Sequence, residues 1–339
     1  MPADRPVIDV HAHLVPARLL DDLQRGALRF DGIEVVERDG GRALSFAGGA
    51  PTRPVPPPLM DEERRRAWMD EQRIDVQVVA GWVDMYGYAL PADEGAEWAR
   101  TLSAAIRDAA RESGRLVPLG TVALQDPESA AGALRDLLDD GFPGVMIATQ
   151  IGERELDEPR FAPFWEAADE LGAVVYLHPS FGASPRHAPH GLVNGLARLE
   201  DTTLTLARLL YAGIPARHPG AKIVASHGGG ALPFVLGRLR RNQAVVARDA
   251  SDPLESLGRL FFDSVVFDPR ALRLLLEQAG PERVLLGSDY PFPIGDLRPR
   301  EVVEGAGLDG ATVERILSAN AVDLVGAERL APALGVGAS

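Results

Sequence analysis

The sequence of 339 residues contains no cysteine and a single lysine, Lys222, so nearly all of its basic charge is arginine. The absence of cysteine excludes disulfide frameworks, thiolate metal sites and cysteine nucleophiles, and it makes the cytoplasm the expected location. No apolar run reaches the roughly 18 residues that a membrane-spanning helix needs. The polar start Met1–Pro6 does not resemble a signal peptide. We therefore expect a cytoplasmic protein that does not associate with membranes.

Basic residues are also fewer than acidic ones, 35 against 49, which gives a formal net charge of −14. A chain this acidic is not expected to bind nucleic acid or an anionic membrane surface. Hydrophobic residues make up 46% of the sequence, enough for a large core, which argues against a disordered chain. The length exceeds that of an average domain, but one barrel with an insertion can occupy all of residues 1–339.

Short apolar segments alternate with longer amphipathic segments along most of the chain. The short segments are rich in Val, Ile and Leu and predict strands, whereas the longer ones predict helices. Eight such units with continuously apolar strands are typical of an α/β fold of the parallel (β/α)8 TIM barrel type. An open doubly wound sheet is the alternative, but the first strand is followed by His11-Ala12-His13 instead of a glycine-rich phosphate loop. The predicted strands are Val7–His13, Val76–Gly81, Leu116–Ala123, Gly144–Thr149, Val174–His178, Lys222–His227, Leu260–Val266 and Val284–Asp289.

The predicted helices follow these strands and mostly end at glycine. We expect the last of them, Thr312–Leu324, to close the domain, and Ala327–Ser339 to form a loose tail. The other clearest helical segments are Asp61–Arg73, Asp93–Ser113, Pro127–Asp140, Arg160–Leu171, Leu199–His218 and Pro269–Ala279.

The segment from about residue 19 to residue 60 departs from the strand–helix repeat. Ile33–Arg38 and Arg42–Phe46 predict a hairpin around Asp39-Gly40-Gly41, and a proline-rich stretch follows at Pro51–Pro58. We interpret this segment as a small β insertion after the first strand. In a parallel barrel it would lie over the C-terminal face, where active sites form.

Histidine is scarce, and its positions predict a metal site. His11 and His13 lie two residues apart in an extended strand, so their side chains project from the same face. His178, His227 and Asp289 end the predicted strands 5, 6 and 8. Because the carboxyl ends of barrel strands meet at one face, we expect these side chains to converge there.

Three imidazoles and one carboxylate suit Zn²⁺, with Mn²⁺ or Fe²⁺ as alternatives. We predict His11, His13, His178 and Asp289 as ligands of one divalent ion, with an open position for water. Asp289 is suited both to bind the ion and to accept a hydrogen bond from that water. His227 is the candidate general acid–base, because histidine is the side chain nearest balanced protonation at neutral pH.

The remaining three histidines have simpler interpretations. His218 precedes Pro219 at the end of a predicted helix, and we expect a surface residue there that interacts with the helix dipole. His187 and His190 lie in a Pro- and Gly-containing stretch after the fifth strand and are expected to be exposed loop residues.

Four stretches resemble the amidohydrolase superfamily, and in particular its decarboxylase branch of the 2-amino-3-carboxymuconate-6-semialdehyde decarboxylase type. They are Val7–His13, Gly141–Gly152, the stretch from His227-Gly228-Gly229 to Arg238, and Gly287–Pro293, and the similarity extends over residues 7 to 326. The resemblance assigns the same four metal ligands and makes His227 the catalytic histidine. The sequence departs from some relatives at Phe267, where they carry a histidine.

The same resemblance implies how a substrate would be held. Arg53 falls where the family has an arginine that binds the substrate carboxylate. Arg238 matches a second arginine that in the family reaches the site from the neighbouring subunit of a homodimer. Arginine suits this role because its guanidinium binds a carboxylate through two hydrogen bonds.

The single lysine narrows the class of enzyme within the superfamily. Many members hold two metal ions bridged by a carboxylated lysine at the end of the fourth strand. The fourth predicted strand, Gly144–Thr149, has no lysine, and Lys222 precedes the sixth strand at the opposite end of the barrel. The resemblance therefore implies a mononuclear enzyme.

These observations predict a metal-dependent, non-oxidative decarboxylase of a small unsaturated or aromatic carboxylic acid. Two alternatives keep the metal: an o-hydroxybenzoate decarboxylase of the resorcylate type, and a hydrolase of a lactone, amide or C–C bond. A third alternative is a non-enzymatic barrel in which the histidines store metal or stabilise the fold.

Overall fold

The computed structural model describes residues 5–180 and 184–335, and parallel strands form its centre. One sheet has the order β1-β4-β5 and another has the order β12-β11-β10-β9-β6, with every pairing parallel. Isolated parallel bridges link the two sheets, between Gly120 and Val145 and between Ala12 and Tyr290. The strands are β1 (Ile8–Leu14), β4 (Val76–Gly81), β5 (Leu116–Pro118), β6 (Gly144–Ala148), β9 (Val174–His178), β10 (Lys222–Ala225), β11 (Phe261–Asp263) and β12 (Val284–Leu285).

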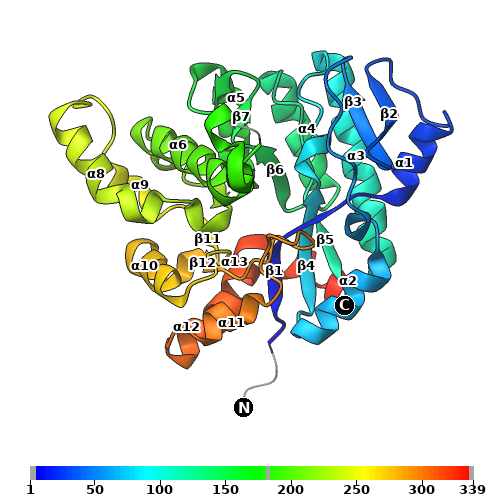
Figure 1. The fold of residues 1–339 in the computed structure, drawn as a ribbon. Helices are drawn as coiled ribbons and strands as arrows, with labels where there is room; N and C mark the ends of the chain where they lie inside the picture. The colour runs from blue at the N-terminus through cyan, green and yellow to red at the C-terminus, as the bar shows by residue number, and fades with distance from the viewer. Residues whose placement is uncertain (1–4, 181–183, 336–339) are drawn as a thin grey trace.

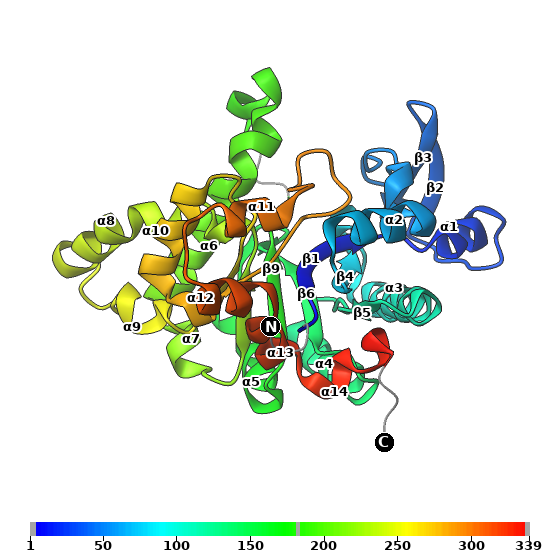
Figure 2. The same ribbon diagram turned by 90° about the horizontal axis from the view of Figure 1, so that it is seen from below.

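Helices surround these strands, as Figures 1 and 2 show, and one or more of them follows each strand along the chain. This βα alternation establishes an α/β fold. The α-helices are α1 (Ala17–Gln24), α2 (Glu62–Gln72), α3 (Ala92–Ser113), α4 (Pro127–Asp139), α5 (Ala162–Leu171), α6 (Arg198–Tyr211), α7 (Ile214–Arg217), α8 (Leu232–Val245), α9 (Pro253–Leu257), α10 (Pro269–Ala279), α11 (Pro299–Glu304), α12 (Gly310–Glu314), α13 (Asn320–Val325) and α14 (Ala327–Leu330).

Both faces of the parallel strands are buried, and successive side chains alternate between two hydrophobic clusters. Tyr176 and Val224 pack in the same cluster as Val10 of β1. Their neighbours Val175 and Ile223 pack in the other cluster, together with apolar residues of α4, α5, α6 and α10. Burial on both faces explains why these strands are continuously apolar in the sequence.

Two antiparallel hairpins accompany the parallel strands. β2 (Ile33–Arg38) pairs with β3 (Gly41–Phe46) between α1 and α2, close to the predicted positions. Figure 1 shows this hairpin at the edge of the molecule, beside α1 and α3. A second and shorter hairpin joins β7 (Gln150–Ile151) and β8 (Arg154–Glu155) after β6.

Three predicted boundaries are wrong. The helix expected over Leu199–His218 is divided into α6 and α7, because Gly213 adopts a left-handed φ of 69° between them. The strands β5, β10, β11 and β12 are shorter than expected, since loops replace their carboxyl ends, whereas β9 has the predicted bounds. The expected loose tail instead forms α14, which buries Leu330, up to residue 335; residues 336–339 lie outside the described part. Among the described residues, no helix combines the length and the apolarity required to cross a membrane.

Candidate metal centre

His11 and His13 lie on β1, which is buried along its whole length, and both side chains are 0% exposed. The carboxylate of Asp9 accepts hydrogen bonds from the backbone N–H of His11 and from that of Ser288, both at 3.0 Å. It therefore ties β1 to the segment that precedes Asp289. This contact positions residues from the two ends of the chain against each other.

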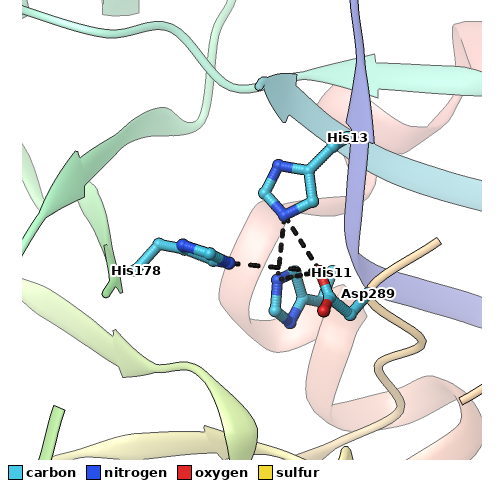
Figure 3. A group of neighbouring side chains, drawn as sticks. All are labelled: His11, His13, His178 and Asp289. Atoms are coloured by element: carbon cyan, nitrogen blue, oxygen red, sulfur yellow. Dashed lines mark hydrogen bonds and ion pairs between the residues drawn. The ribbon is translucent and has the colours of Figure 1, made fainter. Parts of the chain in front are cut away.

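The four predicted ligands converge, as Figure 3 shows. The Nε2 atoms of His11 and His13 are 3.2 Å apart. Oδ1 of Asp289 lies 3.4 Å from His11 Nε2, 3.2 Å from His13 Nε2 and 4.0 Å from His178 Nε2. One ligand atom from each of the four side chains lies within 4.8 Å of the others, and all four residues are buried. Such a group could hold one metal ion.

Electrostatics gives three of these side chains, His13, His178 and Asp289, the protonation that a metal ion requires. His11 differs, because the carboxylates of Asp289 and Asp263 outweigh its burial and raise its pKa. Burial lowers the pKa of His13, and burial together with the neighbouring imidazoles lowers that of His178 well below its usual value. Burial alone would raise the pKa of Asp289, but the imidazoles of His11, His13 and His227 outweigh it and hold that pKa well below its usual value. Two imidazoles are thus held neutral beside an ionised carboxylate.

Two buried polar atoms of this group also favour the binding of a cation. Within the described part of the chain, neither His178 Nε2 nor Asp289 Oδ1 makes a satisfactory hydrogen bond, although both atoms are buried. A buried polar atom without a partner costs about 1–3 kcal/mol. A divalent cation would satisfy both atoms at once, so the residues present fit a bound metal.

His227 lies next to this group but is not one of its four members. Its Nε2 is 3.5 Å from Asp289 Oδ2, and its Nδ1 has no hydrogen-bond partner among the described residues. His227 and Asp289 both have positive φ values, 54° and 58°, which are uncommon for residues other than glycine. Such backbone strain is typical of functional sites, where the surrounding structure holds it in place.

Asp263 is a buried carboxylate at the end of β11 that the sequence analysis did not identify. Its Oδ2 accepts hydrogen bonds from His11 Nδ1 at 2.7 Å, from the Tyr176 hydroxyl at 2.9 Å and from the backbone N–H of His227 at 2.9 Å. Its Oδ1 accepts from the backbone N–H of Gly228 at 2.8 Å. Asp263 therefore fixes the His11 ring with Nε2 toward the other ligands, and it holds the backbone that carries His227.

Replacing Asp263 with asparagine is expected to weaken metal binding about 10- to 100-fold. This is the usual effect of losing a residue that hydrogen-bonds to a metal-binding histidine. An amide has one acceptor oxygen, so its NH₂ group would face N–H or O–H donors that now bind a carboxylate. Zn²⁺ titration against a competing chelator measures the affinity. Tyr176→Phe is the matched control, because it removes one hydrogen bond to Asp263 but leaves that of His11. Wild-type affinity in Asp263→Asn would contradict the orienting role.

A cavity of about 960 Å³ opens onto the group, and His178, His227 and Asp289 contribute to its lining. Arg53 also lines this cavity. Arg238 instead lies exposed on α8 and does not belong to the described residues around the cavity. Within one chain, therefore, Arg53 reaches the site and Arg238 does not.

Of the three remaining histidines, His218 differs from the expectation. It follows α7, but it is 7% exposed, so the predicted surface position is wrong. α7 packs against α6 and α9, and such tertiary contacts are not revealed by the sequence alone. His190 is exposed as expected, and His187 Nε2 lies 2.8 Å from Glu200 at the surface.

Comparisons with known proteins agree with these features. A family model described as amidohydrolase matches residues 8–327. The chain is 28% identical to 2-amino-3-carboxymuconate-6-semialdehyde decarboxylase of Dictyostelium discoideum, over 94% of this chain and 91% of that protein. It is 27% identical to 6-methylsalicylic acid decarboxylase of Penicillium expansum, over 94% of this chain and 95% of that protein.

The fold is shared with a solved structure, that of 5-carboxyvanillate decarboxylase from Sphingomonas paucimobilis. The TM-score is 0.79 at 23% identity, covering 95% of this chain and 99% of that chain. The family match spans nearly the whole of this sequence. The chain therefore belongs to the amidohydrolase family.

Proposed function

We propose that this protein is a metal-dependent, non-oxidative decarboxylase, a carbon–carbon lyase acting on a small unsaturated or aromatic carboxylic acid. The observation that carries the proposal is the convergence of His11, His13, His178 and Asp289 beside His227 at one cavity. The full-length relatives named above are decarboxylases, and they support the same reaction. An acid resembling 2-amino-3-carboxymuconate-6-semialdehyde is the first substrate to test, and a resorcylate-type o-hydroxybenzoate is the second.

The scaffold that we propose is one domain over residues 1–339, a closed eight-stranded barrel with the β2–β3 hairpin as an insertion. Two observations support closure. The bridges Ala12–Tyr290 and Gly120–Val145 join the two sheets at both of their edges. Inward side chains from β1, β9 and β10 also share one hydrophobic cluster. In such a barrel the metal centre occupies the carboxyl end of the strands.

We propose one divalent ion held by His11, His13, His178 and Asp289. Zn²⁺ suits three imidazoles and a carboxylate best, and Mn²⁺ or Fe²⁺ are the alternatives. When bound, the ion would supply a positive charge that polarises oxygen atoms of the substrate and of water. The chain would contribute the orientation of these ligands through Asp263 and the backbone around Asp289.

The protein's own residues account for the remaining steps. Arg53 would bind an anionic group of the substrate, and the apolar part of the cavity would hold its carbon skeleton. As the bond between the skeleton and the carboxylate breaks, CO₂ leaves and the electron pair stays on the skeleton carbon. A proton from Nε2 of His227 would then form the new C–H bond. Asp289, 3.5 Å from that nitrogen, would stabilise the protonated imidazole beforehand.

A homodimer in the cytoplasm is the state that we propose for the working enzyme. Phe234 and Arg238 lie four residues apart and thus share one face of α8, and Phe234 is 83% exposed. A dimer contact that buries Phe234 would also place Arg238 against the neighbouring chain. The cytoplasm is proposed on the cysteine-free composition alone.

The test of the proposed reaction is product analysis with the metal-loaded protein. Carboxymuconate semialdehydes, hydroxybenzoates and benzenedicarboxylates are incubated with it, and CO₂ release is measured alongside the mass of the organic product. We expect products 44 mass units lighter, that is, loss of CO₂ without addition of water. Products whose masses together exceed that of the acid by one water, 18 mass units, would instead indicate a hydrolase. If no acid is converted while metal is bound, the protein is not a decarboxylase of this class.

A further inference from the structure

Arg65 is a buried arginine on α2 that lies outside the cavity. Its side chain is 2% exposed, and it does not belong to the described residues that line the cavity. Its one acidic neighbour among the described ion pairs, Glu62, is 3.9 Å away and 45% exposed. Burying a charge is costly unless other groups stabilise it. This guanidinium must therefore be stabilised by partners inside the protein.

Two hydrogen bonds and one aromatic ring supply that stabilisation. Nη2 donates to the carbonyl of His13 at 2.5 Å, and Nη1 donates to Oε1 of Gln77 at 2.8 Å. The guanidinium also lies over the ring of Tyr290, 4.9 Å from its centroid. An aromatic face attracts a cation in this position. His13 is a candidate ligand, and Tyr290 directly follows another, Asp289.

Gln77 extends these contacts to the carboxylate of Asp9. It is 0% exposed on β4, and its Nε2 donates to Oδ2 of Asp9 at 2.7 Å. The same oxygen accepts from the Ser288 hydroxyl at 2.5 Å. An amide suits this place, because its oxygen accepts from a cation while its NH₂ group donates to an anion. A continuous chain of buried hydrogen bonds thus runs from Arg65 to Ser288.

Asp289 lies between two residues that this arginine holds. Ser288 is reached through the chain of hydrogen bonds, and Tyr290 by direct contact. Trp68, three residues after Arg65 on α2, stacks on the Tyr290 ring with the centroids 4.3 Å apart. Asp289 has a φ of 58°, a conformation that needs support from its surroundings. Both neighbours of this strained residue are therefore held from α2.

Resting on the proposed function and its metal centre, we infer that Arg65 is a positioning residue for that centre. It holds β1 at the His13 carbonyl and also holds both neighbours of Asp289. It would thereby set the separation between the imidazoles of β1 and the carboxylate, from a position outside the cavity. Loss of the guanidinium would leave all four ligands present but allow Asp289 to shift relative to β1. The metal would then be bound more weakly and in a different geometry.

Co²⁺ substitution tests this role without requiring turnover, because the visible absorption of bound Co²⁺ depends on the geometry of its ligands. Arg65→Met replaces the guanidinium with an unbranched apolar side chain. We expect its Zn²⁺ affinity to fall about 10- to 100-fold and its Co²⁺ spectrum to differ from that of the wild type. Arg65→Lys keeps the charge but offers one nitrogen in place of two, so it should recover both properties only in part.

Arg66→Met is the matched control. Arg66 is the next residue of α2, its side chain is 47% exposed, and it donates to the carbonyl of Ser113 on α3 at 2.8 Å. The control removes a contact of the same helix without affecting β1, so it should keep the wild-type affinity and spectrum. The melting temperature of each metal-free variant is measured alongside. A merely structural role of Arg65 would lower that temperature and leave the Co²⁺ spectrum unchanged.

A folded Arg65→Met variant with the wild-type spectrum and affinity would overturn the inference. If this variant does not fold, Arg65→Lys decides in the same way. Equal losses in Arg65→Met and Arg66→Met would also contradict the inference, because anchoring of α2 as a whole would then be responsible. Failure of the proposed reaction is separate. It would appear as absent CO₂ release from the metal-loaded wild type while Arg65→Met still alters metal binding.

Discussion

Replacing His227 with asparagine is expected to lower the decarboxylation rate by a factor of about 10² to 10⁴ and to leave the metal content unchanged. Asparagine has a similar polar side chain, but it cannot deliver a proton to carbon. His227 Nε2 lies 3.5 Å from Asp289 Oδ2 and outside the group of four ligand atoms, so the variant keeps every proposed ligand. CO₂ release under saturating substrate, together with elemental analysis of the same sample, measures both quantities.

His190→Asn is the matched control for this experiment. His190 is exposed after β9, and its φ of 61° is one that asparagine adopts readily. The control should retain wild-type turnover and wild-type metal content. Loss of metal in His227→Asn would mean that His227 is a ligand, and unchanged turnover would mean that another group supplies the proton.

Replacing Asp289 with alanine is expected to lower metal affinity by more than about 100-fold. This exceeds the effect expected for Asp263, which only hydrogen-bonds to a candidate ligand. The variant loses a ligand oxygen and also the only carboxylate in the group of four. It simultaneously removes the negative charge that faces His227. Activity should therefore be undetectable, and the metal content after gel filtration should fall to the background level.

Chelation and reloading separate this effect from misfolding. Wild-type protein treated with a chelator should lose activity and recover it when Zn²⁺ or Mn²⁺ is added back. Asp289→Ala should not recover at the same metal concentration while its circular dichroism spectrum remains that of the wild type. A variant that retains full metal content would exclude Asp289 as a ligand.

The candidate ligands could be predicted from the sequence because their positions follow from the geometry of single strands. His11 and His13 share one face of a strand, and His178 ends another strand at the same edge. The family resemblance based on these motifs is confirmed by the match to residues 8–327. The β2–β3 hairpin could also be predicted from the sequence. Two segments of alternating residues flank the turn Asp39-Gly40-Gly41, and this pattern is typical of a hairpin.

Asp263 could not be found in this way. It lies within a segment that is typical of a buried strand, and the partners of its carboxylate range from 2 to 252 residues away in sequence. Asp263 has no spacing signal, because its role arises from tertiary contacts that only the folded chain creates.

The contact between Asp9 and Ser288 joins positions 279 residues apart, and the ring of His11 binds a carboxylate 252 residues away. A nascent chain released from the ribosome at residue 250 would already hold the three candidate ligand histidines, His11, His13 and His178, yet it would lack both Asp263 and Asp289. Contacts of such high sequence separation form late, because loop closure must be completed first. Tight metal uptake should consequently occur late in folding, once the segment that carries Asp289 has docked against β1.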